Sequence, residues 1–363
     1  MTRLVLLMAI VVFLSSGCRE RACGLSTIVP LDSIDVDSVN HSLGTFTDFH
    51  IIDSTVLLLT DSGKLFRVPM DALGTSPEFL LDSVTAFTAS ADGSICASRE
   101  NGSVDRLTRM GTARVTSIDS TVHILRFNSK NVGYAVTDRG IISLSSSKLF
   151  FPDSLQNSPF TIDDFWNKPR CAFVDSDDNL WVGFNYGEWG GNIVVFDTKT
   201  EQFKMIEFDT LRPSSAPIMS LFEGKNGVIY ATSGLMHFDI AGGIFAIENF
   251  KAKLIYDKFA WNVSENDITN VGEYIGPGAF NEKNKQVLYY SNLGFSYASY
   301  EDGLFCSVSY WKPRLLWRYG QSMAVGYGMN VTKIQFTKNG SLVFLTTANG
   351  IGFLNGDHLI FYK

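Results

Sequence analysis

The sequence has little of what metal, nucleotide or nucleic-acid chemistry requires. It contains five histidines and five cysteines in 363 residues, and none of them forms a C-x-x-C, H-x-H or H-E-x-x-H pattern, so we expect no metal ion. No Walker, dinucleotide-binding or G-x-S-x-G motif is present, so we expect no cofactor. The net charge is −7 and no run of lysine or arginine occurs, which argues against a nucleic-acid partner.

Long apolar segments are also scarce. The run Leu4–Leu14, preceded by Arg3, is too short to cross a bilayer, which needs roughly 20 residues, and is typical of a signal peptide. The small residues Ser15-Ser16-Gly17 before Cys18 resemble a bacterial lipoprotein signal, although the leucine lies one residue further from the cysteine than usual. The resemblance implies removal of residues 1–17 and a lipid, palmitate included, on Cys18. The alternative is an ordinary signal peptide with a chance cysteine.

A lipidated Cys18 would anchor the chain to the outer membrane of a Gram-negative bacterium, with the periplasmic or surface side left open. We expect residues 18–43 to be a tether and residues 44–363 to be one folded domain. No later segment is apolar enough to span a membrane. Cys96, Cys171 and Cys306 lie in strand-like runs and are expected to be small buried apolar residues.

The chain after the signal has no convincing amphipathic helix. Short runs of Val, Ile, Phe, Tyr and Leu recur between Gly, Asn and Asp turns, which is typical of an all-β sandwich, barrel or propeller. Seven such turns follow one another at roughly 40 to 60 residues, within the range of propeller repeats with variable loops. They are Asp53-Ser54, Asp92-Gly93, Ser129–Asn131, Asp177–Asn179, Asn226-Gly227, Asn284-Lys285 and Asn339-Gly340.

The clearest repeat lies in residues 170–209, which read as four strands. Its part from Asp175 to Gly187, continuing to Phe196-Asp197, resembles the propeller repeat of sensor domains in two-component regulators, with the form D-x-x-G-N-L-W-[IV]-G-T. Asp178 replaces the glycine of that pattern and Phe184 the threonine. The match covers one repeat well and the others weakly. It implies a β-propeller of seven four-stranded blades and raises the idea of a sensor domain; a β-sandwich is the alternative.

Paired apolar runs indicate where third and fourth strands lie. We expect these strands in residues 190–209, 242–258 and 302–320, and all four strands of the last blade in residues 331–363. Trp181 alternates with its neighbours in a second strand and should be buried, whereas Trp189 should lie in a loop.

The long connections predict where a ligand would bind. In a propeller, the connection from second to third strand and the link to the next blade lie on one face, and function concentrates on such loops. Aromatic and acidic side chains there suit a sugar or a protein partner, and the acids favour neutral or cationic ligands. The expected ligand-binding residues are Trp189, His237, Tyr300, Trp261, Tyr186 and Glu188.

These observations favour a non-catalytic binding or scaffold domain for a glycan or protein. The alternative is a polysaccharide lyase or hydrolase in which His237 and Tyr297 or Tyr300 act as base and acid; the favoured interpretation assigns no catalytic residue. Two motifs stay open. Asp175-x-Asp177-x-Asn179 is either a turn or the start of a calcium loop. Seven Asp-Ser or Asp-Thr pairs are followed by an aliphatic residue or Thr, as in Asp82-Ser83-Val84, and are either turn formers or O-glycosylation sites.

Overall fold

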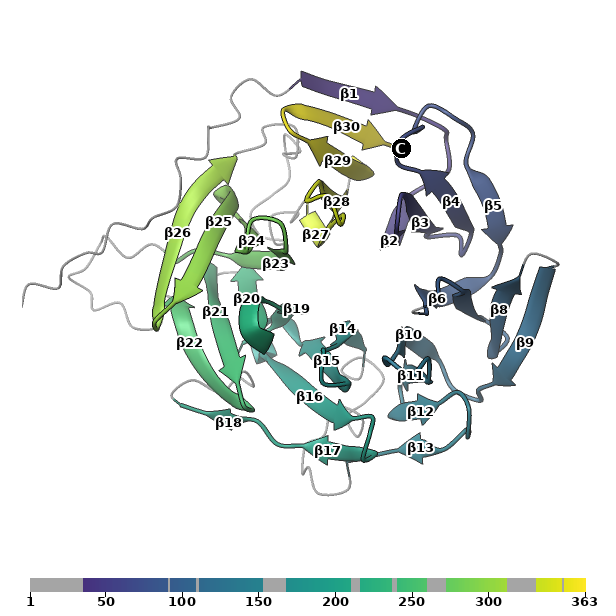
Figure 1. The fold of residues 1–363 in the computed structure, drawn as a ribbon, viewed down its shortest axis with the longest axis horizontal. Helices are drawn as coiled ribbons and strands as arrows, with labels where there is room; N and C mark the ends of the chain where they lie inside the picture. Colours follow the sequence, from purple (N-terminus) through teal and green to yellow (C-terminus); the bar gives the residue numbers. More distant parts are fainter. Residues whose placement is uncertain are drawn as a thin grey trace, which may run out of the picture.

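The computed structural model describes residues 35–90, 92–108, 111–152, 168–209, 216–236, 240–259, 272–311, 331–347 and 349–363. Within these residues the strands form seven separate sheets of four or five strands. Figure 1 shows the sheets placed side by side around a central axis, each with one edge strand facing that axis. The predicted all-β class and the seven-bladed β-propeller are confirmed.

The first four blades each contain four antiparallel strands in chain order from the axis outwards. Blade one has β2 (Phe46–Ile52), β3 (Thr55–Thr60), β4 (Leu65–Pro69) and β5 (Glu78–Leu81). Blade two has β6 (Val84–Ala89), β7 (Ile95–Arg99), β8 (Ser103–Thr108) and β9 (Gly111–Ser117). Blade three has β10 (Val122–Phe127), β11 (Gly133–Thr137), β12 (Ile141–Ser143) and β13 (Leu149–Phe150). Blade four has β14 (Pro169–Val174), β15 (Asn179–Asn185), β16 (Gly191–Asp197) and β17 (Gln202–Lys204).

Blades five and seven each gain a fifth, parallel strand at the outer edge. Blade five has β19 (Ile218–Glu223), β20 (Ile229–Met236), β21 (Ile240–Glu248), β22 (Lys251–Asp257) and the added β18 (Glu207–Phe208). Blade six has β23 (Ile275–Asn281), β24 (Gln286–Ser291), β25 (Gly294–Glu301) and β26 (Leu304–Trp311). Blade seven has β27 (Val331–Phe336), β28 (Leu342–Thr346), β29 (Ile351–Asn355), β30 (His358–Tyr362) and the added β1 (Asp35–Val39).

All seven predicted turns join the first and second strands of their blades. Five of the turns, in blades two, three, four, five and seven, share a hydrogen bond in which the N–H of one residue donates to the carbonyl four residues later. Examples are Asn128 to Val132, Asp175 to Asn179 and Thr337 to Ser341. The repeat seen in the sequence is therefore a repeat of turn geometry, because Asn, Asp and Gly adopt these conformations at low cost.

The core consists of apolar layers between neighbouring blades. In β15, Leu180, Val182 and Phe184 belong to the layer shared with blade three, whereas Trp181 belongs to the layer shared with blade five. Successive side chains of a strand point to opposite faces, so a central strand enclosed by two blades is apolar at nearly every position. This explains the continuous apolar runs of the second strands.

Three boundaries differ from the sequence analysis. Residues 207–208 were expected in the fourth strand of blade four but form β18, which pairs with β22 of blade five. Residues 35–39 were expected in the tether but form β1, which pairs with β30 and extends blade seven. In blade six the expected third and fourth strands in residues 302–320 are wrong: β25, the third strand, precedes residue 302, and residues 304–311 form the single fourth strand β26. The Asp302-Gly303 turn joins these two strands, whereas the second-to-third turn is only Asn292-Leu293.

The three described cysteines differ in whether they form a disulfide bond. Cys96 is buried and Cys171 partly buried, and both are free thiols, as expected for small apolar residues. Cys306 is also buried, as expected, and in addition takes part in a disulfide bond. No helix among the described residues is long and apolar enough to cross a membrane.

Candidate ligand-binding site

The two faces of the ring carry different connections. We call the side with the first-to-second and third-to-fourth turns the turn face. The side with the second-to-third connections and the links between blades is the loop face. Because the strands of each blade are antiparallel in order, these two sets of connections lie at opposite ends of every blade.

The predicted site on the loop face is only partly described. Tyr186, Glu188 and Trp189 all lie in the connection between β15 and β16, where Gly187–Trp189 forms one turn of 3-10 helix. Trp189 is 66% exposed, so the loop position expected for it is confirmed. Tyr186 is partly buried against Phe184, and burial raises its pKa. His237, Trp261 and the lipidation site Cys18 lie outside the described residues.

Tyr300 does not belong to this group. It lies at the end of β25, opposite Phe305 and next to the turn into β26, and its ring packs edge-on against Tyr230. That turn is on the turn face, so the prediction that Tyr300 shares a face with Trp189 is wrong. The cause is the misplaced third strand of blade six. Tyr297, the other tyrosine considered for catalysis, is buried in the same strand.

The carboxylate of Asp175 organises the turn that carries the sequence motif. Its Oδ1 accepts hydrogen bonds from the backbone N–H of Asp177 at 3.0 Å and of Asn179 at 2.7 Å. Its Oδ2 accepts one from the indole Nε1 of Trp181 at 2.7 Å. These bonds give a physical reason for the spacing D-x-x-x-N-x-W and support the turn over the calcium loop. Among the described residues no group of three possible metal ligands was found.

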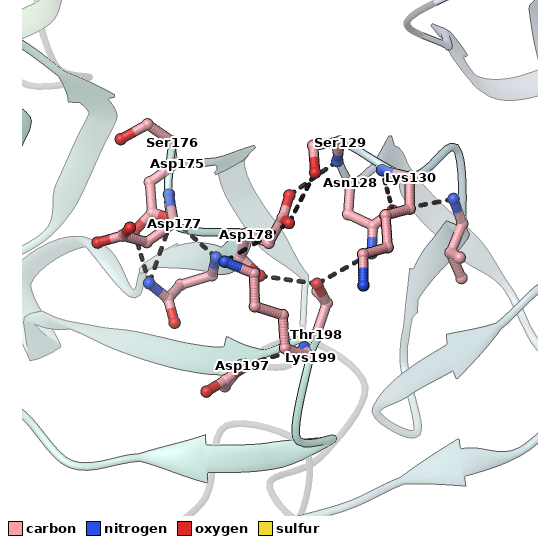
Figure 2. Close-up of polar contacts among 12 residues, drawn as sticks. Asn128, Ser129, Lys130, Asp175, Ser176, Asp177, Asp178, Asp197, Thr198 and Lys199 are labelled. Carbon is pink, nitrogen blue, oxygen red and sulfur yellow. Dashed lines mark hydrogen bonds and ion pairs between the residues drawn. The ribbon is translucent and has the colours of Figure 1, made fainter.

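Asp178 joins blade four to blade three at the turn face (Figure 2). Its carboxylate accepts hydrogen bonds from the backbone N–H and the hydroxyl of Ser129, at 2.7 and 2.8 Å. Its carbonyl accepts one from the Thr198 hydroxyl, which in turn accepts one from the Asn128 amide. Burial alone would raise the pKa of Asp178, but the bonds from Ser129 outweigh it and lower the pKa. The network fixes the turns of two blades relative to each other.

We expect Asp178→Ala to lower the free energy of unfolding by about 1 to 3 kcal/mol at pH 7, since a buried charge-assisted contact is lost. The folded-state pKa is lowered, so this contribution is present above the unfolded value near 3.9 and disappears as the pH falls through the folded-state value. Denaturant unfolding of both proteins at pH 7 and at pH 3 measures it. A stability difference that does not shrink on acidification would contradict a role for the ionised carboxylate.

A cavity of about 610 Å³ opens on the turn face, around the axis. It is formed by the first-to-second turns of five blades. Its lining residues are His50, Ile51, Ile52, Asp53, Ala89, Ser90, Asp92, Gly93, Phe127, Asn128, Ser129, Val174, Asp175, Ser176, Asp178 and Lys338. This turn-face cavity is of a size typical of small-molecule sites, roughly 300 to 1,000 Å³.

Each innermost strand carries the same irregularity near its start. The pairing of the first with the second strand shifts register in all seven blades, as between Phe46 and Asp48 or between Pro169 and Cys171. A bulge bends a strand and redirects a side chain. The bulged residues therefore form a ring near the loop-face end of the channel and include Arg170, whose side chain is exposed.

Charged side chains of four blades meet in the channel. We call Asp48, His50, Arg126, Arg170 and Lys333 the channel cluster. Lys333 forms an ion pair with Asp48 at 2.6 Å between Nζ and Oδ1. Arg126 donates from Nε to the Ala172 carbonyl at 2.8 Å. Arg170 of blade four donates to the Thr332 carbonyl of blade seven at 3.2 Å, so it reaches across the axis.

The electrostatics of the cluster are dominated by its cations. Burial alone would raise the pKa of Asp48, but Lys333 and then Arg126 outweigh it and lower the pKa. Burial, followed by the charges of Lys333 and Arg126, lowers the pKa of His50 to about 3. His50 is therefore neutral at neutral pH. With three cations against one carboxylate, the channel carries a net positive charge in a protein whose total charge is −7.

Sequence reasoning missed the channel cluster entirely. Its members come from four first strands, and apart from Asp48 and His50, which share β2, no spacing in the sequence links them. A charged residue within a strand that otherwise reads as buried was the one available signal, as for Arg126 between Leu125 and Phe127. The sequence analysis expected acidic side chains around the ligand on the loop face, whereas the channel cluster contains more cations than carboxylates.

The seven sheets of the described residues make this chain a seven-bladed propeller. No protein family matches the chain, and no curated protein matches it. Among solved structures it is similar to the extracellular domain of a putative one-component system from Bacteroides thetaiotaomicron, with 14% identity and a TM-score of 0.58. That match covers 89% of this chain and 40% of the other, so the chain spans less than half of the domain it resembles.

Two further similarities are with propellers of other kinds. One is a catalytically inactive virginiamycin B lyase from Staphylococcus aureus with quinupristin, at 13% identity and a TM-score of 0.55, covering 87% of this chain and 97% of the other. The other is the propeller domain of Cps50 (Swd1) from Myceliophteria thermophila, at 11% identity and a TM-score of 0.55, covering 85% and 96%. At these identities the similarities establish the fold alone.

Proposed function

We propose that this chain is a cell-envelope lipoprotein whose propeller is a non-catalytic binding or scaffold domain for a glycan or protein partner. The observation that carries the proposal is the combination of the turn-face cavity with the channel cluster. Both are built on strands and hydrogen-bonded turns, and preformed polar sites of this kind reduce the entropic cost of binding. The similarity to the extracellular domain of a putative one-component system supports a location outside the cytoplasm.

The enzymatic alternative, a polysaccharide lyase or hydrolase, receives less support. It paired His237 with Tyr297 or Tyr300. The ends of β20 and β21 that flank residues 237–239 lie at the loop face, whereas Tyr300 lies at the turn face and Tyr297 is buried. A general base and acid must both reach the reacting group, and the described strands do not bring either tyrosine to that connection.

A screen of glycans and envelope extracts with residues 19–363 tests the proposal. Binding of a glycan or protein that is recovered unchanged after prolonged incubation supports it. Depolymerisation of a bound polysaccharide, measured by new reducing ends or by absorbance of an unsaturated product, would favour the enzyme instead.

The lipid anchor has a separate test. We expect Cys18→Ala to move the protein from the membrane fraction to the soluble fraction without changing its melting temperature. The lipid on Cys18 would supply the membrane affinity, about 0.8 kcal/mol per buried methylene, and no described helix could replace it. Ser26→Ala, eight residues later in the chain, is the control and should stay in the membrane fraction. Membrane association of Cys18→Ala equal to that of the wild type would remove the anchor from the proposal.

A further inference from the structure

Arg126 lies in the channel without a carboxylate partner. Its Nε donates to the Ala172 carbonyl and its Nη1 to the Leu125 carbonyl, at 2.8 and 2.7 Å. These two bonds leave the outer N–H groups of the guanidinium available, and no ion pair is formed with any carboxylate in the described part of the chain. Burial lowers the pKa of Arg126, and the negative charge of Asp48 partly offsets this effect. Asp48 itself already forms an ion pair with Lys333.

Arg170 adds a second cation of the same kind. It donates to the Thr332 carbonyl, and the described residues give it no ion pair. Arg170 is exposed, but Arg126 is partly buried, where a charge without a counter-charge is costly. The Lys333 and Asp48 side chains are 26% and 39% exposed, so a molecule in the channel can reach this pair. The combination describes a positively charged site that an anion would neutralise.

The guanidinium of arginine sets the chemistry of that anion. Its planar N–H groups match the two oxygens of a carboxylate or sulfate. The ammonium of Lys333 can bind one of the same oxygens while it remains paired with Asp48. His50 is neutral, so its ring nitrogens can donate to or accept from a hydroxyl group.

His50 belongs to the channel cluster and also lines the turn-face cavity, so the cluster and the cavity adjoin at this residue. Its wall carries the hydroxyls of Ser90, Ser129 and Ser176 together with backbone groups of the turns. Each hydroxyl donates to a carboxylate and can still accept a hydrogen bond from a ligand. The acids at the wall are already hydrogen-bonded: Asp92, for example, accepts from the Ser90 hydroxyl and from the backbone N–H of Ser94. This lining suits a molecule with several hydroxyl groups. It also disfavours a long polyanion, whose further charges would face the wall carboxylates.

We propose that the channel binds the acidic group of a small polyhydroxylated anion, with uronic acids as the chemical class. The carboxylate lies between Arg126 and Lys333, and the hydroxyl-bearing ring occupies the turn-face cavity beside His50. This inference rests on the proposed binding function and names its ligand class and site. It reverses the preference for neutral or cationic ligands that the sequence suggested.

Calorimetric titration with D-glucuronate and D-glucose tests the proposal, because the two sugars differ at one carbon. We expect the wild type to bind glucuronate at least tenfold more tightly than glucose. Arg126→Gln should lose tenfold to a hundredfold in glucuronate affinity, and Arg126→Lys, which keeps the charge but not the planar N–H groups, should lose less than Arg126→Gln. Asp48→Asn should bind glucuronate more tightly than the wild type, since it removes the competing negative charge. Lys251→Gln changes a 73% exposed cation at the outer edge of blade five, away from the cavity, and should change affinity less than twofold.

A second measurement does not depend on any variant folding. At a few millimolar and equal ionic strength, where the general stabilising effect of sulfate is small, sulfate and glucuronate should raise the melting temperature of the wild type above its value in chloride. Equal melting in all three salts, or equal affinity for glucuronate and glucose, would overturn the proposal. Unchanged glucuronate binding by folded Arg126→Gln would overturn the site. A neutral glycan that binds folded Arg126→Gln and the wild type equally would leave the binding function intact and remove only the anion site.

Discussion

Trp181→Ala is expected to lower the free energy of unfolding by about 3 to 5 kcal/mol, the range found when a buried tryptophan is truncated. Trp181 is 2% exposed and stacks between Phe173 of its own blade and Phe250 of blade five, with ring centroids 6.4 and 5.8 Å away. Truncation would open a cavity between the two blades. It would also remove the indole N–H that donates to Asp175, so the first turn of blade four loses one of its bonds.

Trp189→Ala is the matched control, because it deletes the same side chain from a position 66% exposed in the same blade. We expect a change in unfolding free energy of at most about 0.5 kcal/mol. Trp181→Phe keeps most of the stacked area and should fall between the wild type and the alanine variant. Chemical denaturation of the three variants measures the order. Equal losses for both alanine variants would show that the layer between blades four and five is not as tightly packed as the structure indicates.

Removal of β1 is expected to have a comparable effect through the closure of the ring. β1 pairs in parallel with β30 over five residues, from Asp35 with His358 to Val39 with Tyr362. The backbone of His41 and Val39 bonds to Lys363 at 2.8 and 2.9 Å, and the His41 ring contacts the Leu73 carbonyl of blade one at 3.2 Å. Figure 1 shows β1 along the outer edge of blade seven. This segment therefore links the last blade to the first.

A protein that begins at residue 44 should be less stable than one that begins at residue 34. The loss comprises backbone bonds worth about 1 kcal/mol each and the apolar area of Val39 and Leu43, which pack against the layer between blades seven and one. After the entropy of ordering the segment is deducted, we expect a net loss of about 3 kcal/mol. Thermal unfolding of the two proteins measures it. Identical melting temperatures would mean that apolar packing between β2 and blade seven closes the ring without β1.

The turns were predictable from the sequence because their causes are local. Asp175 fixes its turn through bonds to Asp177 and Asn179, and Asn128 does the same through the N–H groups of Lys130 and Val132. A residue whose partners lie two to four positions away leaves a pattern in the sequence. Seven such patterns at regular spacing were enough to predict seven blades.

Blade six shows where local patterns mislead. The turn between β24 and β25 is the short Asn292-Leu293, whereas Asp302-Gly303 has the stronger turn signal. The stronger signal was interpreted as the end of a long second-to-third loop. Residues of the fourth strand, β26, were therefore assigned to the third strand. Because neighbouring strands are antiparallel, an error of one strand places a connection on the opposite face of the ring. Tyr300 was therefore placed on the wrong face.

The sequence by itself determined the all-β class, the propeller repeat, the first-to-second turns and the burial of Trp181, because each depends on residues close together in the chain. Tertiary structure decided the rest. Lys333 and Asp48 are 285 residues apart in sequence, and they meet Arg126 and Arg170 only because closure of the ring directs four first strands to one axis. The pairing of β1 with β30 has the same origin. No local pattern records which side chains face a common axis, so the positive channel becomes visible only in the folded molecule.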